Sequence, residues 1–180
     1  MTGDNATSRS AIVAWVAEGT WRACVDAASR LAPAGSLITL LHVTPAEVEQ
    51  TAHGAYLGLL GRGSPWRDPG PRVAELAAAS AGELLDAAAR RLGRPCDRLA
   101  VHGRAEREVV SAADGAGLLI LARDGDRSRL GPRSLGKATR FVVDHAPCPV
   151  LLVWPEAVPG IATIPPPPPG KPGKEPPRSA

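Results

Sequence analysis

The most restrictive feature of this 180-residue chain is a regular alternation of short apolar runs with segments of helical periodicity. Runs of four to eight apolar residues are typical of buried strands, and apolar residues spaced three to four apart are typical of helices. A strand, a helix and a second strand in about thirty residues form a βαβ unit with parallel strands. The sequence therefore predicts an α/β fold: an open, mostly parallel, five-stranded sheet with helices on both faces. The apolar runs lie at 11–17, 36–43, 99–102, 118–122 and 150–154.

The helices between these runs have recognisable ends. Thr20 is placed to cap the first helix, which Pro33 and Gly35 close. A different segment, 44–72, separates the second apolar run from the second helix. It is rich in glycine and proline and is predicted to be a loosely packed loop insertion. The other helices are predicted over 73–92, 105–113 and 137–145.

The two ends of the chain differ from this central domain, which we place at 11–154. Residues 1–10 are polar and are predicted to be disordered, without the apolar core of a signal peptide. Residues 155–180 form a proline-rich segment that we expect to be a disordered tail, which a polyproline-binding partner could read. No apolar run approaches the roughly 18 residues that a membrane helix needs. We therefore expect a cytoplasmic protein with no membrane partner.

Composition and motifs exclude several classes of function. A formal net charge of +3 is too small to indicate a nucleic-acid partner by itself. The three cysteines (Cys24, Cys96 and Cys148) are widely spaced and form no CxxC pair, which argues against a disulfide framework and a zinc site. The chain has no GxSxG elbow, P-loop or HExxH motif, so we predict no catalytic residues and no metal.

The strongest functional signal is the segment 122–137, which follows a predicted strand and opens a predicted helix. Only Asp124 and Asp126 oppose its five cations, and its glycines allow the backbone to approach a ligand closely. The N–H groups and the dipole of the helix that starts near Lys137 point into the same space. The segment thus favours a bound anion, most simply a phosphate; the alternative is a solvated loop whose charges only aid solubility. The five cations are Arg123, Arg127, Arg129, Arg133 and Lys137.

Other predicted loops lie at the same edge of the sheet. In open α/β sheets, ligands bind outside the carboxyl ends of the strands. The turn Glu18-Gly19-Thr20, the segment that follows Val43 and the turn 102–104 all follow predicted strands. We expect them to lie beside the segment 122–137.

These segments together resemble the universal stress protein family. The most specific match is His145-Ala-Pro-Cys-Pro-Val150, which precedes the last apolar run. Weaker matches are Leu135-Gly136 before the last helix, Ile12-Val-Ala in the first strand, Leu41-His-Val43 in the second, and the turn Gly103-Arg-Ala105. The resemblance covers roughly residues 10–155, apart from the insertion.

The resemblance implies a nucleotide-binding α-hydrolase-like sheet of strand order 3-2-1-4-5 and a non-catalytic role in stress regulation. It also implies homodimers joined through the last strand, here Val150–Trp154. Some members of the family bind ATP through Gly-x2-Gly-x9-Gly-Ser/Thr, and others lack this motif and do not. Carried onto this chain, the cofactor-binding positions are Glu18, Gly19, Thr20, Val43, Ala122, Arg123, Gly125, Arg133, Gly136 and Lys137.

The chain departs from the ATP motif at each end. Ala122 replaces the first glycine, ten residues instead of nine separate Gly125 from Gly136, and Lys137 replaces the final Ser/Thr. Glu18 stands where the family usually has Asp. ATP is therefore one candidate ligand, and another phosphorylated compound is the alternative ligand. The alternative functions are a dimeric scaffold without nucleotide and a weak ATPase.

Nucleic-acid binding is a weaker alternative. The loop cations, together with Arg140, could contact phosphates, but no helix-turn-helix pattern or set of stacking aromatic residues accompanies them. The high content of Ala, Gly, Pro and Arg suggests a bacterial genome rich in G and C.

Overall fold

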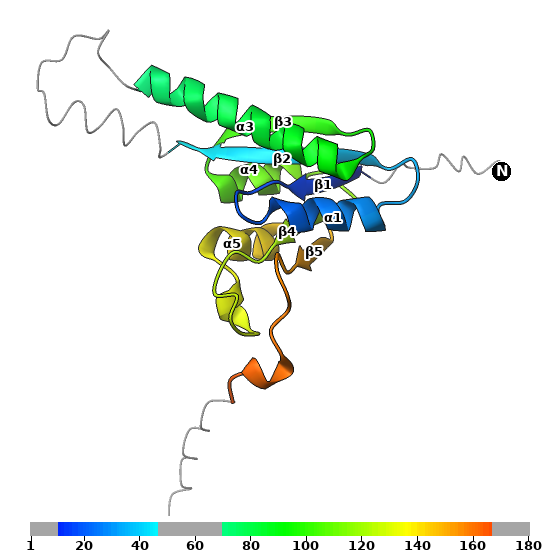
Figure 1. Ribbon diagram of the computed structural model, residues 1–180, viewed down its shortest axis with the longest axis vertical. Coiled ribbons are helices and arrows are strands. Elements are labelled where there is room, and N and C mark those ends of the chain that lie inside the picture. The colour runs from blue at the N-terminus through cyan, green and yellow to red at the C-terminus, as the bar shows by residue number, and fades with distance from the viewer. Residues whose placement is uncertain (1–10, 47–69, 167–180) are drawn as a thin grey trace, which may run out of the picture.

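The computed structural model describes residues 11–46 and 70–166 of the chain. Within these residues, five strands form one parallel sheet in the order β3-β2-β1-β4-β5 (Figure 1). The predicted fold class and strand order are therefore confirmed. The strands are β1 (Ala11–Trp15), β2 (Leu37–Pro45), β3 (Asp97–Gly103), β4 (Leu118–Ala122) and β5 (Val150–Val153).

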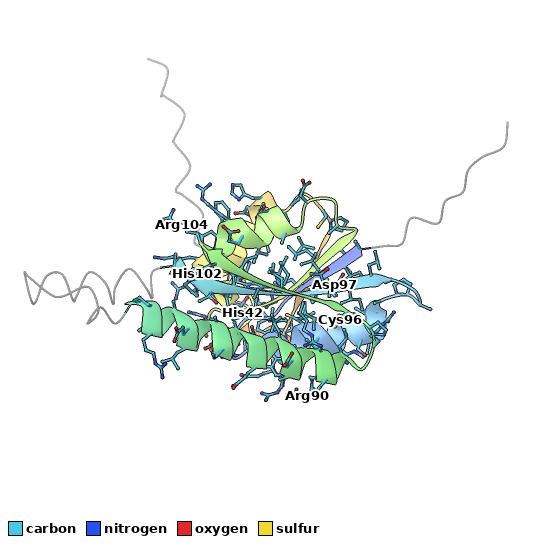
Figure 2. The ribbon with its side chains drawn as sticks, turned by 90° about the horizontal axis from the view of Figure 1, so that it is seen from above. His42, Arg90, Cys96, Asp97, His102 and Arg104 are labelled. Atoms are coloured by element: carbon cyan, nitrogen blue, oxygen red, sulfur yellow. The ribbon has the colours of Figure 1, made fainter. Side chains whose placement is uncertain are left out.

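Helices cover both faces of the sheet. Viewed from above, α3 runs along one face and α4 along the opposite face (Figure 2). Helix α1 packs beside α3, while α5 packs beside α4. The helices are α1 (Trp21–Leu31), α3 (Gly70–Leu92), α4 (Ala105–Ala112) and α5 (Lys137–His145), and short 3₁₀ turns are η2 (Pro132–Ser134) and η3 (Ile161–Thr163).

The core has two layers because successive side chains of a strand point to opposite faces of the sheet. In β1, Ile12 and Ala14 pack against α1 and α3, whereas Val13 and Trp15 pack on the side of α4 and α5. All four side chains are buried. A buried strand of a parallel sheet is apolar on both faces, which explains why the apolar runs show no alternation in the sequence.

The sheet brings the ends of distant segments together. Ala14 of β1 lies between Leu40 of β2 and Ile120 of β4. Because every pairing is parallel, the carboxyl ends of the five strands meet at one edge. The turn after β1, the end of β2, the turn after β3 and the loop after β4 all start from this edge.

The insertion predicted at 44–72 has different bounds in the structure. Strand β2 continues to Pro45, where it pairs with Gly103, and α3 begins at Gly70 instead of residue 73. Pro45 is the last residue of β2, and Pro71 lies in the first turn of α3. Proline fits both positions because neither needs a backbone N–H donor. The rest of the predicted insertion, 47–69, lies outside the described residues.

The last strand and the segment that follows it also differ from the prediction. Strand β5 ends at Val153, whose carbonyl accepts the last sheet hydrogen bond from Arg123 N–H (2.9 Å), so Trp154 lies outside the strand. Residues 155–166 are described, and they contact the loop after β4: Leu130 N–H donates to Thr163 Oγ1 at 3.0 Å. The predicted disorder of 1–10 and 167–180 lies outside the described residues.

Candidate functional site

A cavity of about 450 Å³ lies at the carboxyl ends of β1 and β2, beneath α3. The helix leaves this space because the residues that it turns toward the strands are small. Positions three and four apart share one helical face, so these small side chains act together. The cavity walls include Glu18, His42 and Val43 from the sheet, and Ala77, Ser80 and Ala81 from α3.

Two further hollows, of about 480 and 410 Å³, lie at the opposite edge of the sheet. They flank Cys96, which precedes β3 and is labelled in Figure 2. In open parallel sheets, ligands bind at the carboxyl ends of the strands. We therefore take the cavity beneath α3 as the candidate site.

His42 supplies a polar atom to this cavity. Its ring is 8% exposed and lies between the sheet and α3 (Figure 2). The Nδ1 atom is 2.8 Å from the carbonyl oxygen of Val16, and because a carbonyl only accepts, Nδ1 carries the proton. In the neutral ring, Nε2 is then an acceptor. Because His42 falls inside a buried strand, no local sequence pattern marks it as a residue that lines a cavity.

The turn after β1 contributes one of its three predicted residues to the cavity. Glu18 lines the cavity, as does Val43 at the end of β2, so the structure brings these two predicted residues together. Gly19 has φ +75°, a conformation that glycine adopts without strain, and it lets the chain turn into α1. Thr20 is buried at the N-cap of α1, but its hydroxyl donates to Ala17 O (3.4 Å) and does not cap the helix.

The loop after β4, residues 122–137, folds back on itself. Ala122 is buried as the last residue of β4. Gly125 N–H donates to Ser134 O at 3.0 Å, and Asp126 N–H donates to Arg133 O at 2.8 Å. A Cβ atom on Gly125 would lie 2.4 Å from the carbonyl oxygen of Arg133. Glycine is therefore required at this position by the close approach of two backbone segments.

Arg123 packs inside the loop. Its guanidinium donates to the hydroxyl of Ser134, and its Cζ atom lies 4.7 Å from the centre of the Trp154 ring. This distance is typical of a cation–π contact. Its Nε atom is buried and has no hydrogen-bond partner among the described residues. The arginine thus joins the loop to the chain that follows β5.

Two more arginines of the loop are paired with acids. Arg127 contacts Glu156 at 2.9 Å, and Arg129 contacts Asp126 at 2.9 Å. The pKa of Asp126 is held below its usual range, first by the Ser128 hydroxyl and backbone N–H and then by Arg129. Glu156 comes from the segment after β5, which the sequence did not connect with this loop.

The start of α5 is also occupied by an acid of the loop. Gly136, the N-cap of this helix, donates its N–H to Asp124 Oδ1 at 2.7 Å. Arg133 and Lys137 are exposed, and neither side chain has an ion pair or hydrogen bond with a residue in 11–46 or 70–166. None of the described residues of the loop lines the cavity beneath α3. The predicted site residues therefore form two groups: Glu18 and Val43 line the cavity, whereas those of 122–137 lie in the loop after β4.

The remaining features of the described chain add no second kind of site. No group of three or more His, Cys, Asp or Glu side chains is placed to hold a metal ion within the described ranges. None of the helices described in 11–46 and 70–166 combines the length and the apolar character that a membrane crossing requires. The three cysteines are unpaired, and burial raises the pKa of Cys24 to about 12.

Solved structures of universal stress proteins share this fold. One, in complex with cAMP, has a TM-score of 0.56 and 18% identity, and the match covers 82% of this chain and 98% of that protein. Another, UspA from Lactobacillus plantarum, has a TM-score of 0.52 and 21% identity, with 81% and 97% covered. At such identities the likeness establishes the fold alone.

The sequence itself establishes the family. No curated protein sequence shows a significant match to the chain. The sequence model of the universal stress protein family, however, matches residues 17–153, a range that runs from the turn after β1 to the end of β5. The chain therefore belongs to the universal stress protein family.

Proposed function

We propose that this chain is a non-catalytic, cytoplasmic regulator of the stress response that binds an adenine nucleotide or nucleoside. Its base would occupy the cavity beneath α3. The observation that carries this proposal is the position of the cavity, at the carboxyl ends of β1 and β2, with Glu18 and Val43 in its walls. A universal stress protein of similar fold was solved with cAMP, which makes an adenine compound the first ligand to test.

The chemistry of the cavity suits a flat heteroaromatic ring. Val43, Ala77 and Ala81 offer apolar surface, while Glu18 and the Nε2 atom of His42 offer hydrogen-bond acceptors. Ligand sites of this type are mostly apolar with a few placed polar groups, and volumes of 300–1,000 Å³ are usual. The exocyclic amine of adenine and the ribose hydroxyls are donors that match these acceptors.

The loop after β4 is the proposed position of the phosphate. Arg133 and Lys137 are its two exposed cations with neither an ion pair nor a hydrogen bond to a described residue, so they are the candidates for this contact.

Isothermal titration with adenosine, cAMP and Mg-ATP tests the proposal. Ala77→Leu adds bulk to the cavity wall and should weaken binding of every ligand by about tenfold or more, because the base loses its space. Ala79→Leu on the exposed side of α3 makes the same change outside the cavity and should leave binding unaltered. No binding of any of the three ligands at millimolar concentration would leave a scaffold without nucleotide as the function.

We also propose that two copies of the chain pair through β5. All four residues of this strand are apolar and half-buried, and among the described residues β5 pairs only with β4. Unpaired apolar strand edges bind a further strand readily. The carbonyls of Pro149 and Val153 point to β4, so alternation directs the backbone N–H of Leu152 away from it.

Light scattering after gel filtration tests this pairing. Leu152→Pro removes an outward N–H and spares the hydrogen bonds to β4, so a dimer should become a monomer. The same change at another exposed leucine, Leu31→Pro, would break α1 and is not a suitable control. The control is therefore Leu76→Ala, at an exposed position of α3, which should stay dimeric. A monomeric unaltered chain at about 100 μM would refute pairing through this edge.

A further inference from the structure

The ring of His42 is held in one tautomer by the chain beside it. Its Nδ1–H donates to Val16 O at 2.8 Å, and Val16 N–H donates in turn to Leu41 O at 2.7 Å. Val16 and Leu41 are fully buried, so the carbonyl that orients the ring is itself fixed in the core. The other neutral tautomer would set two acceptors 2.8 Å apart and lose the hydrogen bond. The neutral ring therefore keeps an acceptor at Nε2.

This Nε2 atom faces the cavity beneath α3. Strand β2 turns His42 to the side of α3, as it does Leu40 two residues earlier (Figure 2). In the part of the chain that the structure describes, Nε2 has no hydrogen-bond partner. The fully buried polar side-chain atoms without a partner in that part are Arg123 Nε and Thr139 Oγ1, so Nε2 is not sealed in the core. Because His42 lines the cavity, a ligand reaches Nε2 from there.

The cavity has a closed inner end and an open rim. Two of its lining residues, His42 and Ala81, are buried, whereas Glu18 and Ser80 are exposed. Sugar hydroxyls are costly to bury, while a flat heteroaromatic ring gains from burial. A nucleoside therefore enters with its base toward His42 and its ribose toward the rim. The group of the base that meets Nε2 must then be a hydrogen-bond donor.

Resting on the proposed function, we infer that His42 is a specificity-determining residue: its Nε2 atom accepts a hydrogen bond from the amine of a 6-aminopurine, and the site selects such bases over purines without this donor. A purine that lacks the amine would cover Nε2 and leave it without any partner, water included. An enclosed acceptor without a partner costs more than the hydrogen bond itself contributes.

Titration calorimetry of the full chain with adenosine and with purine riboside tests this inference. Purine riboside carries a hydrogen atom in place of the 6-amine, so it removes the donor and adds no bulk. We expect adenosine to bind about tenfold more tightly than purine riboside. The titrations are made at about pH 8, where an ordinary imidazole is neutral.

The variant His42→Asn assigns this preference to Nε2. The asparagine amide can donate to Val16 O in place of Nδ1–H, but it has no atom in the place of Nε2. Adenosine binding should weaken about tenfold, to the affinity of purine riboside. A change in the shape of the cavity would affect both ligands alike, so the ratio of the two affinities reports the hydrogen bond.

His145→Asn is the matched control. His145 is exposed at the end of α5, away from the cavity walls, and its Nδ1 atom lies 2.8 Å from Phe141 O, so the same change is made at a similar hydrogen bond. Both affinities should stay unaltered. If His42→Asn does not fold, nitrogen-15 NMR of the unaltered chain replaces it: the Nε2 resonance of His42 should differ between the two complexes, and identical resonances would overturn the inference.

The possible failures differ from one another. Equal affinities for adenosine and purine riboside, or a preference for adenosine that His42→Asn retains, would overturn the inference and keep the nucleotide site. Failure of both nucleosides to bind where cAMP or Mg-ATP does would have the same meaning. Failure of adenosine, cAMP and Mg-ATP alike would overturn the proposed function, and the inference with it.

Discussion

Replacing Gly125 with alanine tests whether the loop after β4 is closed by direct contact between its backbone segments. The new Cβ atom would lie 2.4 Å from the carbonyl oxygen of Arg133 and 2.8 Å from the carbonyl carbon of Ser134. Both atoms belong to the backbone, so no side-chain rotation can relieve the overlap. The two segments must separate, and the hydrogen bonds from Gly125 N–H and Asp126 N–H are then lost.

The expected cost follows from these two hydrogen bonds. Each contributes about 0.5–1.5 kcal/mol, so Gly125→Ala should lower the free energy of unfolding by about 1–3 kcal/mol. The free energy of unfolding of a small domain is about 5–15 kcal/mol, so a loss of this size is measurable. Urea unfolding followed by circular dichroism gives the difference, provided that the slope with denaturant is the same for both proteins.

Gly82→Ala is the matched control for the same chemical change. Gly82 is exposed within α3, and a Cβ atom there meets nothing within 4 Å. Alanine should stabilise this helix by about 0.5–1 kcal/mol. The two substitutions thus have opposite predicted signs. A Gly125→Ala variant as stable as the unaltered chain would refute the reasoning about the closed loop.

Three further predictions concern single groups. Arg91 hydrogen-bonds the Asp26 carboxylate through two contacts of 2.7 Å and lowers the pKa of Asp26. Asp26 therefore stabilises the fold above its ordinary pKa of about 3.9, and this contribution is lost as the pH falls through the lower pKa of the folded state. Asp26→Asn should lower the urea midpoint at neutral pH, and a difference between the two proteins that persists at about pH 2 would contradict this. Burial raises the pKa of Cys24 to about 12, so iodoacetamide should alkylate the two half-buried thiols of the native chain and reach Cys24 only after unfolding, as intact mass spectrometry can show. The buried hydroxyl of Thr139 has no hydrogen-bond partner among the described residues, so Thr139→Val should raise the free energy of unfolding by about 1 kcal/mol, and a loss of stability in urea would show that the hydroxyl is satisfied.

Elements with strong local signals could be predicted from the sequence almost to the residue. Strand β4 and helix α5 have the predicted bounds, Leu118–Ala122 and Lys137–His145. A glycine-rich turn precedes the strand, and Pro147 follows the helix, so the ends are set by residues close in sequence. The strand order, in contrast, came from the family resemblance, because the order of strands depends on contacts between distant segments.

The pairing of charges in the site could not be predicted, because it depends on segments far apart in the chain. The sequence set five cations of the loop against two acids, but Glu156, after β5, neutralises Arg127 as well. Residues 155–166 lack apolar periodicity and contact the loop through single polar atoms, such as Thr163 Oγ1. A search for periodic patterns does not detect such contacts.

Only part of the cavity wall could be predicted from the sequence. Glu18 and Val43 follow from their positions at strand ends. The small residues of α3 lie beyond the insertion, and nothing local in the sequence shows that this helix crosses over β2. A run of small residues on one helical face, here Ala77, Ser80 and Ala81, is the signal that could have indicated a space beneath the helix.

The central place of β1 in the sheet has a consequence for the synthesis of the chain. On one side β1 pairs with β2, in which Leu37 faces Ala11 only 26 positions earlier. On the other side Ile12 faces Leu118, which is 106 positions later. At about 5–20 residues per second, translation leaves that side of β1 without its partner for roughly 5–20 s. A nascent chain that ends after Gly103 can form β3-β2-β1, yet it exposes an apolar strand edge that the completed protein covers with β4.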